Sequence, residues 1–228
     1  MNDKSKIAYT LTRTRRKTVS IRVRDGEVFV TAPLGMAPSE VDGFVAAKEK
    51  WIREKTEISK AQAAQREAFR LEYEGTILYR GREYPITAAA NGESGFDGEK
   101  FFMPPNLTAE EIKEACISIY KALAARLLTE RTAYFSERMG VTPTGVRINS
   151  AKYRWGSCSS KGRINFSWRL IMAEDEAIDY VIVHELAHMM EMNHSHRFWL
   201  VVEAVLPDYP RRIRYLDELQ RRLICERW

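Results

Sequence analysis

The stretch Tyr180-Val-Ile-Val-His184-Glu185-Leu-Ala-His188 carries the strongest chemical signal in the sequence. Two histidines four residues apart lie one turn apart on one face of a helix, so both imidazoles can reach one metal ion. The glutamate beside the first histidine can lie over an open coordination position and take a proton from a water there. The flanking residues are apolar, and a buried helix would leave these polar side chains unpaired unless they had a partner. The stretch therefore predicts a metal site with hydrolytic chemistry.

A catalytic zinc site needs a third protein ligand and an open fourth position. All four histidines of the chain lie between residues 184 and 196. We favour His194 as the third ligand, because Asn193 tolerates the left-handed conformation and can turn the chain back after the helix. His196 is an alternative ligand and is otherwise expected on the surface or lining the cleft. The remaining candidates are two carboxylates, Glu191, which shares the face of the two motif histidines, and Glu203.

Residues 107–228, which contain this motif, are expected to form a mainly helical portion. The sequence Thr108-Ala-Glu-Glu111 is a capping box for a helix that ends at about Met139, with Gly140 as its C-cap. Its expected buried stripe is Ile112, Cys116, Ile119, Leu123, Leu127 and Tyr134. Short strands are expected around 146–148, 155–158 and 164–168, and further helices over about 175–192, 198–206 and 210–226.

Residues 1–106 are expected to form a β-rich portion with one helix. Alternating residues 19–24, the turn Asp25-Gly26 and the return strand from Val28 predict a hairpin. A helix follows from about Ser39, with Asp42 three residues on, and residues 60–72 either continue it or connect it onward. Its expected apolar stripe is Val41, Phe44, Val45, Trp51 and Ile52. A second hairpin (76–79 and 83–87), a loop (91–98) and a strand at 101–102 complete this portion. The whole chain is therefore predicted to be an α+β protein with domains 1–106 and 107–228.

The segment Arg154–Ser159 has two interpretations. In the first, it is the edge strand beside the metal site and pairs with an extended substrate peptide through its backbone. Arg154, Trp155, Gly156 and Ser157 then line the substrate cleft together with His196. In the second, the tryptophan and Cys158 pack in the core and the glycine forms a bulge, without substrate contact.

Composition excludes several classes of protein. No run of about 18 apolar residues occurs, so no transmembrane helix is expected, and the N-terminal residues lack the apolar core of a signal peptide. The three cysteines are widely spaced and support neither a disulfide framework nor a metal knuckle. A cytoplasmic location is the expectation. The net charge of +5 is compatible with nucleic-acid contact, although the basic run Arg13–Lys17 is more typical of a solvated strand entry.

The sequence resembles the YgjP-like metallopeptidases and, more distantly, the SprT and Spartan proteases. The first similar motif joins residues 180–188 to Asn193-His-Ser195 and Phe198-Trp199, and the second is Arg154-Trp-Gly-Ser-Cys-Ser159 with Gly162, Ile164 and Trp168-Arg-Leu170. Leu206-Pro-Asp208, Arg15-Arg-Lys-Thr-Val-Ser-Ile21, Ala32-Pro33 and Trp51-Ile52 are similar too. The sequence departs from the family pattern at Glu174, where proline is common, at the acidic Glu191 and at His196.

The resemblance implies a zincin-like fold with zinc as cofactor, His184, His188 and His194 as ligands and Glu185 as base. The favoured function is therefore a zinc-dependent peptidase that acts on proteins or peptides through a glutamate-activated, zinc-bound water. One alternative is a metal-dependent hydrolase of another amide. The other is a nucleic-acid-associated zinc protein, either a DNA-linked protease or a binding module without activity.

Overall fold

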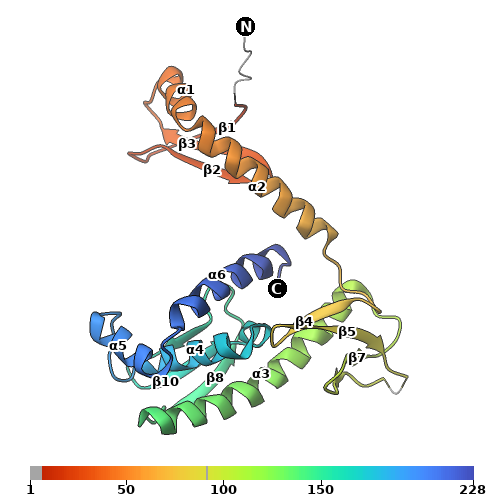
Figure 1. Cartoon of the computed structure of the whole chain (residues 1–228). Coiled ribbons are helices and arrows are strands. Elements are labelled where there is room, and N and C mark those ends of the chain that lie inside the picture. Colours follow the sequence, from red (N-terminus) through yellow and green to blue (C-terminus); the bar gives the residue numbers. More distant parts are fainter. Residues whose placement is uncertain (1–6, 91) are drawn as a thin grey trace. The chain divides into compact units, whose positions relative to one another are not determined.

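The computed structural model describes residues 7–90 and 92–228 and confirms the expected α+β class. Its contacts divide the chain into two compact units, which we call the N-terminal unit (Met1–Phe69) and the C-terminal unit (Arg70–Trp228). This division falls between residues 69 and 70, whereas the predicted domain boundary lies between residues 106 and 107. Figure 1 traces the elements in chain order. None of the described helices is both long and apolar enough to span a membrane.

A three-stranded sheet forms one layer of the N-terminal unit. Its strands are β1 (Thr10–Thr14), β2 (Ser20–Arg24) and β3 (Glu27–Pro33), in the order β1-β3-β2. The predicted hairpin is β2–β3, and its turn residues Asp25 and Gly26 have φ of 51° and 82°, the positive values that a type I′ turn requires. Strand β1 was not predicted from the sequence. It pairs in parallel with β3, with Thr10 opposite Phe29.

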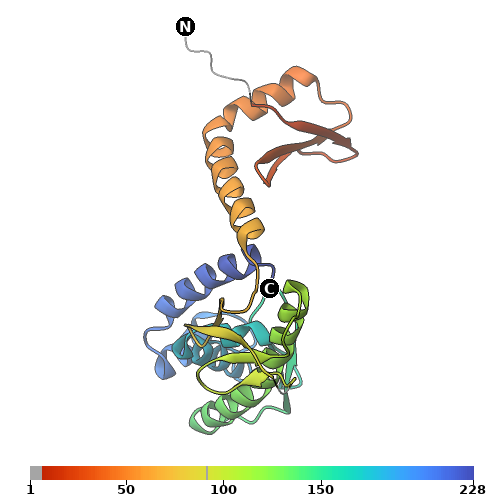
Figure 2. The same ribbon diagram turned by 90° about the vertical axis from the view of Figure 1, so that its right-hand side faces the viewer.

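Two helices cover one face of this sheet, α1 (Pro38–Ala47) and α2 (Glu49–Ala68) (Figure 2). The buried core between the layers consists of Val28, Val30, Ala32, Val41, Val45 and Ile52. The expected cap at Ser39 is wrong: the N-cap is Ala37, whose N–H donates to the Glu40 carboxylate at 2.8 Å, and Pro38 fits the first helical position. The chain leaves helical geometry at Lys48 (φ −108°), so the apolar stripe is interrupted and Trp51 is 42% exposed.

The C-terminal unit begins with a four-stranded sheet in the order β4-β5-β7-β6. Its strands are β4 (Thr76–Tyr79), β5 (Arg82–Ala88), β6 (Gly95–Phe96) and β7 (Phe101–Met103). The hairpin β4–β5 was predicted, whereas β6 lies in the segment 91–98 that was expected to be a loop; residue 91 is outside the described residues. The N–H groups of Arg80 and Gly81 donate to the carbonyls of Ile171 and Met172 at 2.8 and 3.1 Å. These bonds attach the sheet to the rest of the unit and explain the position of the boundary.

The long helix α3 (Ala109–Met139) has the predicted ends. Thr108 accepts a hydrogen bond from the N–H of Glu111 and caps the helix, and Gly140 closes it with φ of 67°. The predicted stripe is only partly right, because Leu123 and Leu127 are half-buried and Tyr134 is 52% exposed. The buried face is instead formed by Ile112, Cys116, Ile119, Tyr120, Ala124, Leu128, Thr132 and Phe135.

The last third of the chain builds the layer that carries the histidines. A second three-stranded sheet has the order β8-β10-β9, from β8 (Gly145–Asn149), β9 (Gly156–Cys158) and β10 (Arg163–Ser167). A 3₁₀ helix (Trp168–Met172) leads into α4 (Asp175–Ala187), followed by α5 (His196–Val205) and α6 (Tyr209–Cys225). Helix α4 lies against α3, and Arg131 of α3 forms an ion pair with Asp179 of α4.

Candidate metal centre

Helix α4 and the turn after it position the histidines. His184 lies in the last turn of α4, and His188 is its C-cap. The expected end at Met192 is wrong, because the N–H groups of Met189 and Met190 bond to carbonyls three residues back, at 3.0 Å each. This tightening ends the α-helix at Ala187, so the chain turns back within a few residues.

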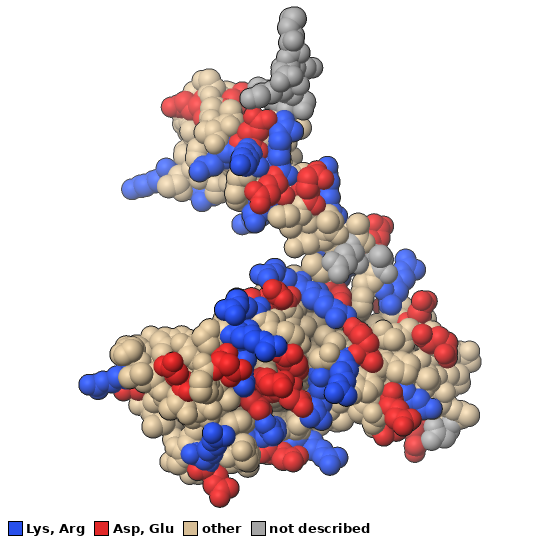
Figure 3. All heavy atoms as spheres, in the orientation of Figure 1, with Lys and Arg blue, Asp and Glu red and all other residues tan. Residues whose placement is uncertain are grey.

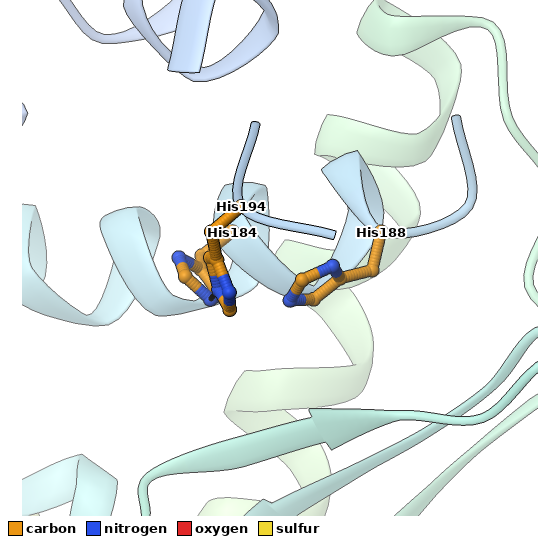
Figure 4. A group of neighbouring side chains, drawn as sticks. All are labelled: His184, His188 and His194. Carbon is orange, nitrogen blue, oxygen red and sulfur yellow. Dashed lines mark hydrogen bonds between the residues drawn. The ribbon is translucent and has the colours of Figure 1, made fainter. Parts of the chain in front are cut away.

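The turn brings His194 against the two histidines of α4 (Figure 4). The Nε2 atoms of His184 and His194 are 3.1 Å apart, and one nitrogen from each of the three rings lies within 4.8 Å of the others. His184 is half-buried and His194 is exposed, so the group lies at the rim of the unit. His196, the first residue of α5, is exposed and is not part of this group.

Two polar groups hold the imidazoles in place through their Nδ1 atoms. Nδ1 of His188 is 3.2 Å from the backbone carbonyl of Glu191, and since a carbonyl only accepts, this nitrogen carries the proton. Nδ1 of His184 is 3.3 Å from the hydroxyl of Tyr180. Both contacts leave Nε2 turned toward the other histidines, as a metal-ligating imidazole requires.

Burial keeps the two histidines of α4 neutral. It lowers the pKa of His184 to about 3, with further lowering by His188 and His194. It also lowers the pKa of His188, against the opposing effect of the Glu191 carbonyl. Neutral imidazole is the form that coordinates a metal ion.

Glu185 is a buried carboxylate with a free oxygen. The residue is 5% exposed, and its Oε2 has no hydrogen-bond partner among the residues that the structure describes. Burial raises the pKa of this carboxyl to about 7, while nearby Arg154 acts in the opposite direction. An unpaired buried carboxylate is costly, so its retention is typical of a functional site.

Gly156 of β9 makes room for that carboxylate. A Cβ atom at this position would lie 2.6 Å from Oε1 of Glu185 and 2.9 Å from its Cδ. Only glycine therefore permits strand β9 to lie this close to the glutamate.

The ring of Phe198 forms the floor beneath all three histidines. Its centroid lies 4.6 Å from that of His188, 4.7 Å from His194 and 4.9 Å from His184, and the side chain is fully buried. Helix α5 therefore supports the cluster with an apolar surface and adds no donor of its own to it.

Comparison with known proteins agrees with this geometry. The family model described as YgjP-like, metallopeptidase domain, matches residues 17–219. The chain belongs to the YgjP-like metallopeptidase family. Among solved structures, the crystal structure of the metallopeptidase zymogen of Pyrococcus abyssi abylysin matches 42% of this chain and 91% of its own chain, at 27% identity and a TM-score of 0.35. No curated protein matches the chain.

A pocket of about 280 Å³ adjoins the glutamate side of the centre in this YgjP-like chain. Its lining comes from the segment before and in β9 and from helices α4 and α6: Arg154, Trp155, Gly156, Tyr180, Val181, His184, Glu185, Ile213, Leu216 and Asp217. Three of the four predicted cleft residues of segment 154–157 are therefore here. Ser157 does not line the pocket, and its hydroxyl instead accepts a hydrogen bond from Asn165 at 3.4 Å.

Strand β9 lies at the edge of its sheet, next to this pocket. Cys158 in the same strand is half-buried, and burial and the charge of Glu185 raise the pKa of its thiol. A raised pKa disfavours the thiolate, which agrees with a site that does not use cysteine as a nucleophile.

Sequence reasoning missed three groups that shape the YgjP-like site. The hydroxyl of Tyr180 and the carbonyl of Glu191 contact the imidazoles, whereas the Glu191 carboxylate is not part of the donor group. Phe198 supplies the apolar floor. Tyr180 and Phe198 could have been found from the sequence, because both belong to the motifs quoted above. The Glu191 carbonyl could not, because every residue has a backbone carbonyl. Glu203, the other carboxylate candidate, is exposed on α5 and lies outside the group.

Proposed function

We propose that this YgjP-like chain is a zinc-dependent peptidase in which His184, His188 and His194 hold the metal and Glu185 is the general base. The observation that carries the proposal is the convergence of three imidazole nitrogens within 4.8 Å beside a buried carboxylate oxygen that has no partner in the described part of the chain. Imidazole nitrogens whose lone pairs face one another and a buried carboxylate without a partner both lower the stability of the fold. Their presence is therefore better explained by metal binding and catalysis than by packing.

The donor set fits a catalytic zinc ion. Three imidazoles are a known ligand set for catalytic zinc, whereas a structural site closes all four positions with protein ligands. The described residues group three donors and no fourth here. This supports an open position and argues against a purely structural role.

Glu185 and Gly156 have different roles in the proposed hydrolysis. A zinc ion in such a site supplies Lewis acidity that makes water acidic near neutral pH. Glu185 accepts the proton of the attacking water and delivers it to the leaving amine. Its buried Oε2 is available for this role, because it has no hydrogen-bond partner among the described residues. Gly156 holds open the space in which the carboxylate lies.

Strand β9 is the surface proposed to bind the peptide. Its position at the sheet edge lets an extended chain add to it by backbone hydrogen bonds. A side chain of that peptide would enter the adjoining pocket, whose walls include Trp155, Val181 and Leu216. The proposed substrate class is therefore an extended, unfolded segment with an apolar residue near the cleaved bond.

The test separates the ligands from the base. His184→Ala, His188→Ala and His194→Ala should each lower the zinc content of the purified protein, because two imidazoles hold the ion poorly. Glu185→Gln should keep the zinc and lose about 10²–10⁴-fold in hydrolysis, because an amide cannot accept the proton. Elemental analysis and a casein or peptide cleavage assay measure both quantities, and circular dichroism verifies the fold.

His196→Ala is the control for metal content, since this exposed histidine lies outside the donor group. Full zinc in His194→Ala together with its loss in Glu191→Ala would show that the third ligand is wrong. Hydrolysis by Glu185→Gln at the parent rate would refute the general-base assignment.

A further inference from the structure

The net positive charge of the chain comes from its N-terminal unit. Residues 1–69 contain 14 basic and 9 acidic side chains, so this unit accounts for the entire net charge of +5. Residues 70–228 contain 22 of each and are neutral overall. Figure 3 accordingly shows both signs interspersed over the visible face of the C-terminal unit. The asymmetry indicates that the smaller unit meets an anionic partner.

The sheet of the N-terminal unit has one face that its own helices leave uncovered. Helices α1 and α2 pack on the face that carries Val28, Val30 and Ala32. Side chains alternate along a strand, so the register places Thr10, Thr12, Ser20, Arg22, Phe29 and Thr31 on the opposite face. We call this set the open face. Within it, Phe29 on the central strand lies between Thr10 and Arg22 on the flanking strands.

Several exposed cations of this unit lie on or beside the open face, while others, such as Lys50 and Lys55, lie on α2. The loop 15–19 joins β1 to β2 past the end of β3, and its Arg16 donates to the hydroxyl of Ser20 at 2.8 Å. Arg15, Lys17 and Arg22 are exposed as well. Arg13 is different, because it bonds to the carbonyl of Met36 at 2.6 Å and thereby holds the segment after β3. The basic run therefore has one structural member, and the others remain accessible.

We propose that the open face of the N-terminal unit binds single-stranded nucleic acid. A half-exposed aromatic ring on a central strand is a platform on which a base can stack. Guanidinium groups at its flank pair with phosphates, and threonine and serine hydroxyls donate to phosphate oxygens. The open face offers all three kinds of group within three neighbouring strands.

The composition of this face also disfavours other anionic partners. A membrane surface would require several apolar side chains among the cations, whereas the register places only Phe29 and Pro33 of the described apolar strand residues on this face. An acidic peptide would leave the aromatic ring without a function. A flat sheet does not enter a groove of a duplex as a helix or two-stranded ribbon does. Glu27, at the turn end of β3, lies on the same face as Phe29, and the register places it opposite Arg24.

The test measures binding of the full chain to a fluorescein-labelled oligothymidylate of about 20 nucleotides by anisotropy over a salt series. The parent should bind with an affinity that falls steeply with salt. Arg15→Gln/Arg22→Gln should weaken binding about tenfold and lower the salt slope by about 1.4, because each lost phosphate contact on a single strand removes about 0.7. Phe29→Leu, which keeps an apolar side chain, should weaken binding about tenfold through lost stacking.

The matched control is Lys50→Gln/Lys55→Gln, which removes the same charge from exposed positions of α2. It should change the affinity by less than about twofold, since it leaves the phosphate contacts in place. An equal loss in both double variants would overturn the proposal, because only net charge would then matter. Binding of poly-glutamate or phosphatidylserine vesicles as tightly as the oligonucleotide, or no binding of the oligonucleotide at all, would overturn it too. Peptidase activity is a separate readout, so the inference stands or falls independently of the proposed function.

Discussion

Helix α4 in the C-terminal unit and the sheet in the N-terminal unit arrange polar side chains in opposite ways. The three imidazoles around α4 converge on one point, and Glu185, next to His184 in the chain, is 5% exposed. The side chains of the open face stand in parallel rows, and Thr10, Thr12 and Arg22 are exposed. Convergent donors beside a buried carboxylate fit a compact cation and a reaction, because the low dielectric around the carboxylate strengthens its interactions. Parallel rows in water fit a long polymer that is bound through many weak contacts.

If the two units perform their proposed functions independently, removal of the metal should affect only one of them. Treatment with a zinc chelator should abolish hydrolysis, because the Lewis acid is lost. Nucleic-acid affinity should change by less than about twofold, because zinc makes no phosphate contact on the open face. Cleavage and anisotropy assays on the same treated sample measure both. Restoration of hydrolysis by added zinc is the control, and a parallel loss of both functions would break the comparison.

Gly156→Ala should cause the next largest effect. The new Cβ would overlap Oε1 of Glu185 at 2.6 Å, so the carboxylate has to move. Misplacement of a reacting group by about 1 Å typically costs about 100-fold in rate, and we expect a loss of that size with zinc content retained. Gly43→Ala in α1 is the matched control, because a Cβ atom at that position would have nothing within 4 Å. Parent-like turnover of Gly156→Ala would show that the glutamate need not lie where the structure has it.

Core truncations should then show whether the units unfold separately. Ile52 in α2 and Leu128 in α3 are 1% and 0% exposed, in different units. Replacement of either by alanine should cost about 2–5 kcal/mol in the free energy of unfolding of its own unit. Calorimetry should therefore show two transitions, with only one lowered in each variant. On heating, Ile52→Ala should lose nucleic-acid binding at a lower temperature than hydrolysis. Leu128→Ala should lose hydrolysis at a lower temperature than nucleic-acid binding. A single transition that moves equally in both variants would contradict two independent units.

The features predicted correctly from sequence are those that local chemistry determines. The capping box at Thr108 and the glycine at 140 specified both ends of a 31-residue helix. The turn Asp25-Gly26 specified the hairpin β2–β3. The sequence also predicted that His184, His188 and His194 lie together, because two share a helix face and the third follows a residue that can turn the chain; their role as metal ligands stays a prediction.

The features that sequence analysis missed depend on contacts between distant segments. Strand β1 exists through parallel pairing with β3, which leaves no turn signal between them. The hairpin β4–β5 belongs to the C-terminal unit through hydrogen bonds to carbonyls about 90 residues further along the chain, at Ile171 and Met172. The role of Glu191 lies in its backbone carbonyl, which every residue has. Side-chain patterns carry no information on such bonds.

The smallest predicted effect concerns the capping box of α3, which belongs to the C-terminal unit alone. The Thr108 hydroxyl accepts from the Glu111 N–H at 3.3 Å, and the Glu111 carboxylate accepts from the Thr108 N–H at 2.8 Å. Thr108→Ala should therefore cost about 1 kcal/mol and lower only the transition of that unit. The N–H and the hydroxyl of Thr108 both donate to the Glu111 carboxylate, at 2.8 Å each, and these two bonds lower the pKa of Glu111 below its ordinary value of 4.5.

Because that pKa is lowered on folding, the charged carboxylate stabilises the helix above its unfolded pKa, and this contribution is lost as the pH falls through the folded pKa. Glu111→Gln keeps the acceptor of the capping box but cannot ionise. The parent should therefore unfold at a higher temperature than Glu111→Gln at pH 7, and the difference should shrink toward zero in acid, as measured by circular dichroism. A difference that stays constant with pH would mean that the charge on Glu111 contributes nothing to the cap. A shift in the transition of the N-terminal unit would mean that the two units are coupled.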